Sequence, residues 1–256
     1  MSNLNDSMIN RLKSQGYVVI EDLLDPDLDL QPVEEEYNFL LDELAMELQV
    51  QGKLKTLHGG LSFIHRLVEI MVESGQEFSQ QFDISLPQHG VTEDTPMHHG
   101  QAVFNLLRSP RLLDAIEFFM GPEIYCNPVQ HTRIKIPERL LPAEQRNSLT
   151  SLVHWHNDNG VILEEADEST ILTVWLPITD ATEENGCLEI IPGSHQKDLP
   201  THCPDPVKGV HIPLHCLPET NPIPVPMKRG SVLFMNQRTV HSSLPNRGND
   251  IRWRFD

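Results

Sequence analysis

Positive charge is scarce in this sequence of 256 residues. It has 19 lysine and arginine residues against 37 aspartate and glutamate residues, which gives a formal net charge of −18. A surface that binds nucleic acid needs clustered basic side chains to contact phosphates, and an anionic membrane surface selects for the same kind of patch. We therefore expect neither nucleic acid nor a membrane as a partner.

Long apolar runs are also missing. No stretch approaches the roughly 20 apolar residues that cross a bilayer, and residues 1–11 lack the apolar core of a secretion signal. The few cysteines are scattered rather than paired at short spacing: Cys126, Cys187, Cys203 and Cys216. Because sparse cysteines suit a reducing compartment, the sequence predicts a cytoplasmic protein without a disulfide framework.

Acidic residues, by contrast, are concentrated at the N-terminal end. Residues 1–50 hold 12 of the acids but only Arg11 and Lys13 as bases. Over residues 32–50 apolar side chains recur at helical spacing between the acids. A charge run of this kind usually forms the solvated face of a helix, so most of the net charge is expected on an outer helical layer.

The character of the chain changes near residue 121, where Gly121 and Pro122 end the last helical pattern. Short β-type runs with glycine and proline between them follow, at 129–136, 170–176, 186–193, 230–235 and 251–255. Helices followed by such runs predict a mainly β protein with flanking helices, built on an antiparallel barrel or jelly roll.

We expect one domain over residues 1–256. Its N-terminal part, 1–120, is expected to be mainly helical, and 121–256 to form the β core. Residues 138–150 and 197–226 are expected to be long loops. The second contains eight prolines, so it is stiff, and long loops on a compact domain often cover a site as lids.

One short cluster among the 13 histidines is typical of a metal site: His154-Trp155-His156-Asn157-Asp158. In a strand, residues two apart point to the same side, so His156 and Asp158 would aim an imidazole and a carboxylate at one point. His154 would lie about 13 Å from Asp158, at about 3.3 Å per residue. We expect it to be a neighbour of the metal rather than a ligand.

A third ligand and a cation follow near the C-terminal end. The strand-like run 230–236 leads to His241, and Arg252 follows eleven residues later. A facing histidine would complete a site of two histidines and one carboxylate that leaves coordination positions open. An arginine on the next strand would supply a bidentate partner for an anionic cosubstrate. Arg254, two residues on, competes for that role.

This combination resembles the phytanoyl-CoA dioxygenase-like family of iron(II)/2-oxoglutarate-dependent oxygenases. The resemblance covers about residues 155–254. Besides the residues above, it rests on Trp175-Leu176-Pro177, Gly186-Cys187-Leu188, Pro192-Gly193-Ser194-His195, Gly230-Ser231-Val232, Ser243 and Asn246. His195, in the turn of this pattern, is expected to be structural.

The resemblance implies a double-stranded β-helix core of the jelly-roll or cupin type. It implies that His156, Asp158 and His241 are the catalytic residues and hold iron(II). It also implies that Arg252 pairs with the distal carboxylate of 2-oxoglutarate, with Ser243 donating a hydrogen bond beside it.

The activity implied is that of a non-haem dioxygenase that uses O2 and 2-oxoglutarate to hydroxylate a small molecule, with release of succinate and CO2. Because Asp158 is present where related halogenases have a small residue, oxygenation is favoured over halogenation. The acidic net charge favours a neutral or cationic substrate over a coenzyme A thioester.

The sequence leaves the lining of the pocket open. Residues 130–135 resemble a strand that lines the cosubstrate pocket in this family. Either Gln130 and Thr132, or the alternate set His131, Arg133 and Lys135, would face inward.

Two alternatives remain at this stage. One is a structural zinc protein, with ligands drawn from residues 187–216: Cys187, His195, His202, Cys203, His211, His215 and Cys216. Their spacing lacks most of the short pairs of structural zinc sites, and Pro213 separates His211 from His215. The other is a non-catalytic β-barrel binding protein whose metal site has decayed.

Overall fold

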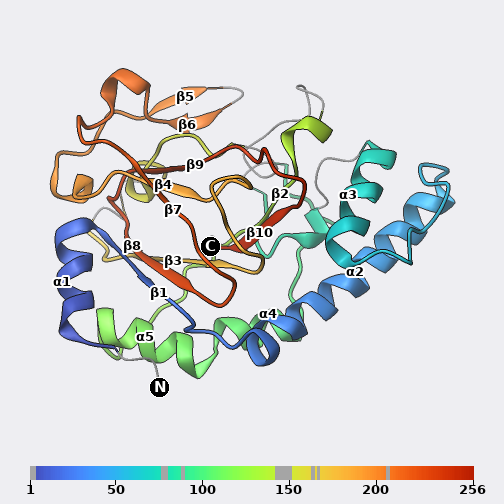
Figure 1. Ribbon diagram of the computed structural model, residues 1–256, viewed down its shortest axis with the longest axis horizontal. Coiled ribbons are helices and arrows are strands. Elements are labelled where there is room, and N and C mark those ends of the chain that lie inside the picture. The colour runs from blue at the N-terminus through green and yellow to red at the C-terminus, as the bar shows by residue number, and fades with distance from the viewer. Residues whose placement is uncertain are drawn as a thin grey trace.

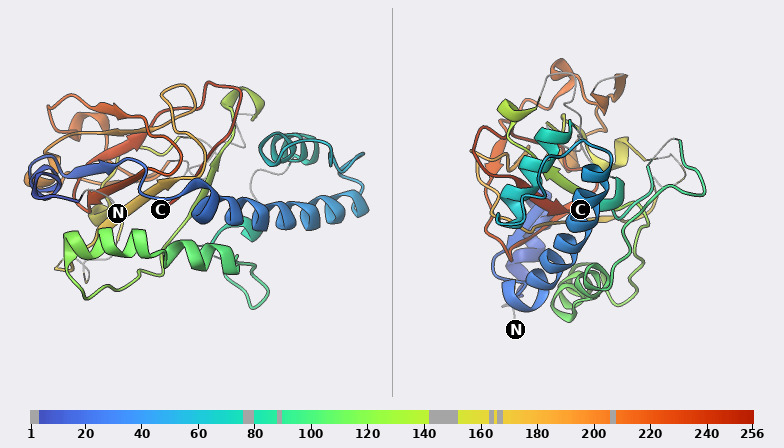
Figure 2. Two further views of the ribbon diagram at one scale, coloured as in Figure 1. Left: turned by 60° about the horizontal axis from the view of Figure 1, so that its bottom comes forward. Right: turned by 90° about the vertical axis from the view of Figure 1, so that its right-hand side faces the viewer.

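The strands of the protein form two antiparallel sheets that face each other, with helices along the outer side of the larger sheet (Figures 1 and 2). The structure is a computed structural model that describes residues 4–75, 80–87, 90–141, 152–162, 165, 168–205 and 208–256.

The α-helices of the described chain come early in the sequence. They are α1 (Asp6–Gln15), α2 (Gln31–Val50), α3 (Phe63–Ser74), α4 (Gln101–Leu107) and α5 (Pro110–Met120). A π-helical turn, η1 (Pro26–Leu30), runs directly into α2. Single 3-10 turns are η2 (Gln80–Phe82), η3 (Glu138–Leu140), η5 (Asp158–Gly160), η7 (Ser194–Gln196) and η8 (Leu214–Cys216).

The strands are short. They are β1 (Tyr17–Ile20), β2 (Thr132–Lys135), β3 (Leu172–Pro177), β4 (Leu188–Ile190), β5 (Cys203–Asp205), β6 (Gly209–His211), β7 (Ile223–Val225), β8 (Val232–Asn236), β9 (His241–Ser243) and β10 (Arg252–Phe255). The larger sheet has the order β1-β8-β3-β10-β2 and the smaller one β7-β4-β9, while β5 and β6 form a separate hairpin.

Each strand of the larger sheet sends alternate side chains to opposite faces, as the two-residue period of a strand requires. The outer face packs against the helices in one hydrophobic core; its members include Ile134, Leu176, Phe234, Trp253 and Phe255. The inner face packs against the smaller sheet in a second core; its members include Trp175, Leu188, Ile190, Leu233 and Met235. The space between the two sheets is therefore apolar at one end.

Helix α1 shows how local sequence sets an element boundary. The Asn5 side chain accepts a hydrogen bond from the Ser7 N–H at the first turn, and Gly16 ends the helix in the left-handed region at φ +86°. A Cβ on Gly16 would lie 2.4 Å from Thr239 Oγ1. Glycine is therefore required at this position both for its backbone conformation and for close packing.

The expected antiparallel core with flanking helices is confirmed, but the chain as a whole is a mixed α/β protein rather than a mainly β one. Residues 197–226 are not a plain loop, because they contain the β5–β6 hairpin, η8 and β7. Of the other expected loop, 138–150, residues 142–150 lie outside the described residues. The N-terminal part also supplies β1 to the larger sheet, where it pairs with β8.

Within the described residues, no helix is both long enough and apolar enough to cross a membrane.

Candidate metal centre

The sequence triplet His156-Asn157-Asp158 meets His241 through the backbone. His156 and His241 exchange both N–H···O hydrogen bonds of an antiparallel bridge, at 3.0 and 2.8 Å. Asp158 then opens the η5 turn, in which the Asn157 side chain accepts a hydrogen bond from Gly160 N at 2.8 Å. The bridge sets the two imidazoles side by side, and the turn brings the carboxylate in front of them.

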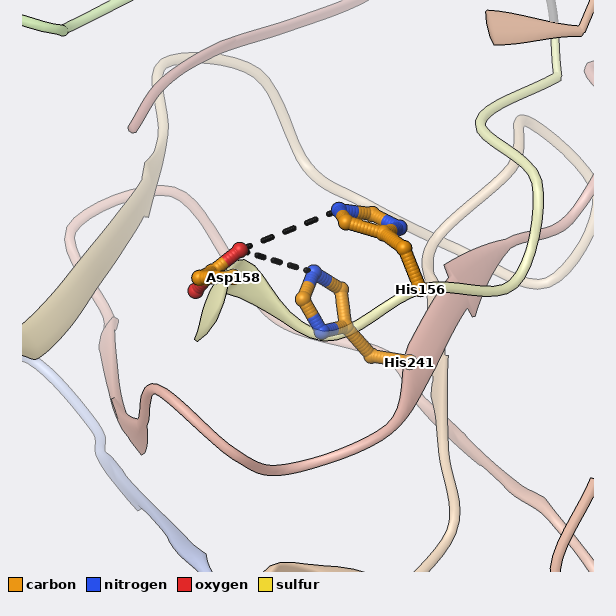
Figure 3. Close-up of side chains that lie close together, drawn as sticks. All are labelled: His156, Asp158 and His241. Carbon is orange, nitrogen blue, oxygen red and sulfur yellow. Dashed lines mark ion pairs between the residues drawn. The ribbon is translucent and has the colours of Figure 1, made fainter. Parts of the chain in front are cut away.

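Three potential ligand atoms converge at this point (Figure 3). The Nε2 atoms of His156 and His241 each lie 3.8 Å from Asp158 Oδ1, and the two ring centroids are 4.2 Å apart. The ligand atoms of these three residues lie within 4.8 Å of one another. At 3.8 Å neither contact is a hydrogen bond, so the three atoms share a position that a cation can bridge.

Hydrogen bonds at the other ring nitrogens set the tautomers. His156 Nδ1 lies 2.8 Å from the His154 carbonyl and His241 Nδ1 lies 3.0 Å from the Thr239 carbonyl. A carbonyl only accepts, so each Nδ1 carries the proton and each Nε2 keeps its lone pair for a metal. Burial, and next His241, hold the pKa of His156 well below its usual value, which favours the neutral, ligating form.

The second carboxylate oxygen of Asp158 is also held. Thr173 on β3 donates from its hydroxyl to Asp158 Oδ2, which leaves Oδ1 for the metal. Sequence reasoning did not identify Thr173. Its signal is the two-residue spacing from Trp175, because both side chains fall on the inner face of the same strand.

The inner face of the larger sheet next to this centre carries positive charge. Arg252 and Arg254 on β10 lie directly opposite Lys135 and Arg133 on β2. Of the alternate set, Arg133 and Lys135 face inward, whereas His131 contacts Asp83, with Nδ1 3.0 Å from Asp83 Oδ2. Thr132 faces the helices, and its hydroxyl lies 3.0 Å from the Tyr37 hydroxyl.

Arg252 is 1% exposed, and within the described chain its Nε and Nη1 atoms have no hydrogen-bond partner. Its guanidinium lies 5.6 Å from the centroid of the Trp175 ring. Burial lowers the pKa of Arg252, and Arg254 adds to the effect. A buried arginine with open donors needs an anionic acceptor, and a carboxylate of a bound ligand meets that need.

Ser243 lies on the same side of this space. Its Oγ accepts hydrogen bonds from Lys135 Nζ at 2.7 Å and from Val153 N at 3.0 Å. With both lone pairs used, the hydroxyl hydrogen remains for donation to an anion. The predicted site residues are thus brought together: His156, Asp158 and His241 at the metal position, and Arg252 and Ser243 on the cationic side.

The residues of the alternative zinc site are not assembled. Among the residues that the structure describes, the group at His156, Asp158 and His241 is the one set of three potential ligands. Burial raises the pKa of Cys187 to about 11, which disfavours the thiolate form that zinc binds. His195 lies in η7, with Nε2 3.0 Å from the carbonyl of Lys13.

Two histidines and one carboxylate are the protein ligands typical of non-haem iron(II) oxygenases. The site described above, between two antiparallel sheets, is of this class. A family model described as phytanoyl-CoA dioxygenase (PhyH) matches residues 12–253. The chain belongs to this family, and it is an iron(II)- and 2-oxoglutarate-dependent oxygenase.

Individual relatives are distant in sequence. "Phytanoyl-CoA dioxygenase domain-containing protein 1" of Danio rerio is 22% identical over 265 residues, which cover 96% of this chain and 86% of the relative. The peroxisomal phytanoyl-CoA dioxygenase of Bos taurus is 24% identical over 158 residues, 59% of this chain and 44% of that protein.

Solved structures share the fold. EvdO2 from Micromonospora carbonacea var. aurantiaca aligns with a TM-score of 0.60 at 16% identity, over 99% of this chain and 89% of that chain. The epimerase SnoN, in complex with Fe3+, alpha ketoglutarate and nogalamycin RO, aligns with a TM-score of 0.57 at 18% identity, over 98% of this chain and 80% of that chain.

Proposed function

We propose that the protein hydroxylates a small molecule at a C–H bond, coupled to oxidative decarboxylation of 2-oxoglutarate. His156, Asp158 and His241 hold iron(II) as its three protein ligands. The observation that carries this role is the convergence of two Nε2 lone pairs and Asp158 Oδ1 without a hydrogen bond among them. Iron(II) with 2-oxoglutarate supplies the activation of O2, and succinate and CO2 are released.

The protein residues orient the reactants. Arg252, with two unpaired donor atoms in the described chain, holds the distal carboxylate of 2-oxoglutarate. Ser243 donates its remaining hydroxyl hydrogen to the same carboxylate. Thr173 fixes the rotation of Asp158 through Oδ2. The backbone carbonyls of His154 and Thr239 keep both imidazoles in the tautomer that binds metal.

The fold supports the same proposal. We infer that the two facing sheets form a double-stranded β-helix, as the alignments to SnoN and EvdO2 over almost the whole chain support. We also infer a single oxygenase domain over residues 1–256. SnoN was solved with nogalamycin RO bound, which supports a small molecule as the class of substrate here.

The hairpin region within 197–226 is proposed to cover the site. Ile212 N donates to the Trp155 carbonyl at 2.7 Å, and Asn157 N donates to His202 Nε2 at 3.3 Å. These bonds attach the region to the backbone on both sides of His156. A cover over the centre would exclude water during the reaction.

The test compares metal content and cosubstrate turnover in one set of variants. The purified protein is reconstituted with iron(II), and bound iron and succinate formation under air are measured for wild type and His156→Ala. Loss of the hydrogen-bond partner of a metal ligand weakens metal binding by up to about 100-fold. Removal of the ligand itself should weaken iron binding by more than that. Succinate formation should disappear in the variant.

Cys203→Ser is the matched control, because Cys203 belongs to the alternative zinc set and not to the centre. It should bind iron and form succinate as wild type does. Full iron binding by His156→Ala, or iron-loaded wild type that never consumes 2-oxoglutarate, would contradict the proposal.

A further inference from the structure

The inner face of the larger sheet has more positive charge than one cosubstrate carboxylate requires. Arg254 lies directly opposite Arg133, two register positions beyond the pair of Arg252 and Lys135. Arg254 is 3% exposed. Like charges directly opposite each other destabilise a sheet, and burial increases that cost. Arg254 therefore needs an anionic partner on this face.

Asp256 meets only part of this need. Its Oδ2 atom pairs with Arg254 Nη1 and lies 3.6 Å from Arg133 Nε, so two guanidiniums share one oxygen. Within the described chain, Nε of Arg254 has no hydrogen-bond partner. A guanidinium presents donors in a planar fork that matches both oxygens of a carboxylate. The Arg254 fork is thus only partly used.

Arg254 also lies on the metal side of the cationic cluster. Arg254 pairs with Pro177 on β3. The inner face of β3 continues from Pro177 through Trp175 to Thr173, whose hydroxyl holds Asp158. Arg252, two register positions away, faces Lys135, which is bonded to Ser243. The two arginines of β10 therefore serve different parts of the space.

The ring of Trp175 contacts the guanidiniums of both arginines. The guanidinium carbon of Arg254 lies 5.4 Å from the ring centroid and that of Arg252 lies 5.6 Å from it. Cation–π contact restricts the motion of each guanidinium. Both forks are thus held in place before any ligand binds, which lowers the entropy cost of binding.

Building on the proposed function, we propose that Arg254 binds a carboxylate of the primary substrate. The substrate class is then a small carboxylic acid, in contrast to the neutral or cationic molecule that the net charge favours. Arg252 keeps the distal carboxylate of 2-oxoglutarate. With its carboxylate on Arg254, the substrate is anchored beside the metal ligands, and its neighbouring C–H bonds face the centre.

The experiment measures binding without turnover. Full-length protein is loaded with iron(II) and 2-oxoglutarate under nitrogen, and titrated calorimetrically with acid–amide pairs of the same skeleton. The probes are hexanoate with hexanamide, 3-phenylpropionate with 3-phenylpropionamide, and N-acetyl-leucine with N-acetyl-leucinamide. At least one acid should bind wild type about tenfold or more tightly than its amide, because a charge-assisted pair is lost in the amide.

Arg254→Gln should reduce this preference to within about twofold, because the amide side chain no longer pairs with a carboxylate as an ion. Arg254→Lys keeps the charge without the fork and should retain part of the preference. If Arg254→Gln does not fold, Arg254→Lys still tests the proposal. Arg139→Gln is the control, since Arg139 is exposed and bonds to Asn249 outside this cluster. It should keep the full preference.

The affinity for 2-oxoglutarate separates the two proposals. It should fall strongly in Arg252→Gln and stay within about threefold in Arg254→Gln, since each arginine serves its own ligand. Equal losses in both variants would place Arg254 in the cosubstrate anchor and overturn this inference while leaving the proposed function intact. The inference would also be overturned, with the proposed function intact, if wild type bound none of the acids more tightly than the matching amide. Failure of iron-loaded wild type to bind 2-oxoglutarate would instead overturn the proposed function.

Discussion

The two faces of the larger sheet carry opposite chemistry on the same strands. In β10, Trp253 and Phe255 face the helices and lie in a continuous hydrophobic core, whereas Arg252 and Arg254 face the smaller sheet. All four side chains are buried. Burial therefore does not distinguish the faces; what distinguishes them is that the outer side chains have apolar neighbours and the inner ones have donors left for a ligand.

Neighbouring residues of one strand therefore have different roles: those on the outer face stabilise the fold, and those on the inner face are available to bind a ligand. The outer face contributes apolar area removed from water, which stabilises the fold. The inner face holds buried cations that cost free energy until an anion binds. Four substitutions test this separation.

The largest effect is expected on the outer face. Trp253→Ala should lower the free energy of unfolding by about 4 kcal/mol, because Trp253 is fully buried and packs on the rings of Tyr37 and Phe63 at 4.8 and 5.1 Å. Urea unfolding measures the change. The folded variant should bind 2-oxoglutarate with an affinity within about threefold of wild type. Phe104→Ala, at an exposed position of α4, should cost less than about 0.5 kcal/mol.

The next effect belongs to the inner face. Arg252→Gln should raise the Kd for 2-oxoglutarate about 100-fold, or about 2.7 kcal/mol, because it removes the ionic partner of the distal carboxylate. Its free energy of unfolding should change by less than about 1 kcal/mol, since the lost guanidinium has unpaired donors. Calorimetric titration and urea unfolding give the two numbers. A large stability loss with unchanged Kd would reverse the roles of the two faces.

The third effect is a pH dependence. Burial holds the pKa of Lys135 well below its usual value, and Arg252 and Arg254 lower it further. Between that lowered value and the ordinary value near 10.5, the unfolded chain binds the additional proton, so stability rises with pH. Lys135→Met should remove up to about 1.4 kcal/mol per pH unit from this slope.

Urea unfolding at pH 7 and pH 9 measures the slope. Lys228→Met, at an exposed position, should leave it unchanged. Equal slopes in wild type and Lys135→Met would show that burial does not lower the pKa of Lys135.

The smallest effect is expected at a polar contact on the outer face. The Tyr37 hydroxyl donates to the Phe82 carbonyl at 2.8 Å and lies 3.0 Å from Thr132 Oγ1. Tyr37→Phe should lower the free energy of unfolding by about 1 kcal/mol, because it removes a buried hydrogen bond without a change in shape. Thermal unfolding measures it. Any change in the affinity for 2-oxoglutarate would show that the two faces are coupled through β2.

The net charge of the protein and the charge on the inner face of the larger sheet have opposite signs. The value of −18 describes a chain whose first 50 residues are rich in exposed acids. It indicates nothing about the inner face of the larger sheet, where Arg133, Arg252 and Arg254 lie. The substrate preference inferred from composition therefore differs from the one inferred from the inner face, because the field between the sheets is set by the nearest charges.

Much of the candidate site could be predicted from the sequence. His156 and Asp158 stand two residues apart, and His241 and Arg252 follow at fixed spacing, so the donor types and their order along the chain were sufficient for a metal and an anion to be inferred. The ends of α1 at Asn5 and Gly16 were also predictable, because capping depends on neighbouring residues alone.

Other parts depended on contacts between distant segments. Thr173 could be assigned to Asp158 only once β3 was placed beside η5. The inward direction of Arg133 and Lys135 required the pairing of β2 with β10, since a shift of one residue turns every side chain to the other face.

The sequence by itself determined the ligand types, their spacing and the acidic outer layer, because these properties belong to single residues and their near neighbours. Only the tertiary structure decided that Arg133 and Lys135 face the same side as Arg252 and Arg254, that Ser243 has one hydrogen left to donate, and that the interior is cationic in an acidic protein. The physical reason is that burial, register and hydrogen-bond partners are relations between segments far apart in the chain, and they exist only once the two sheets pack face to face.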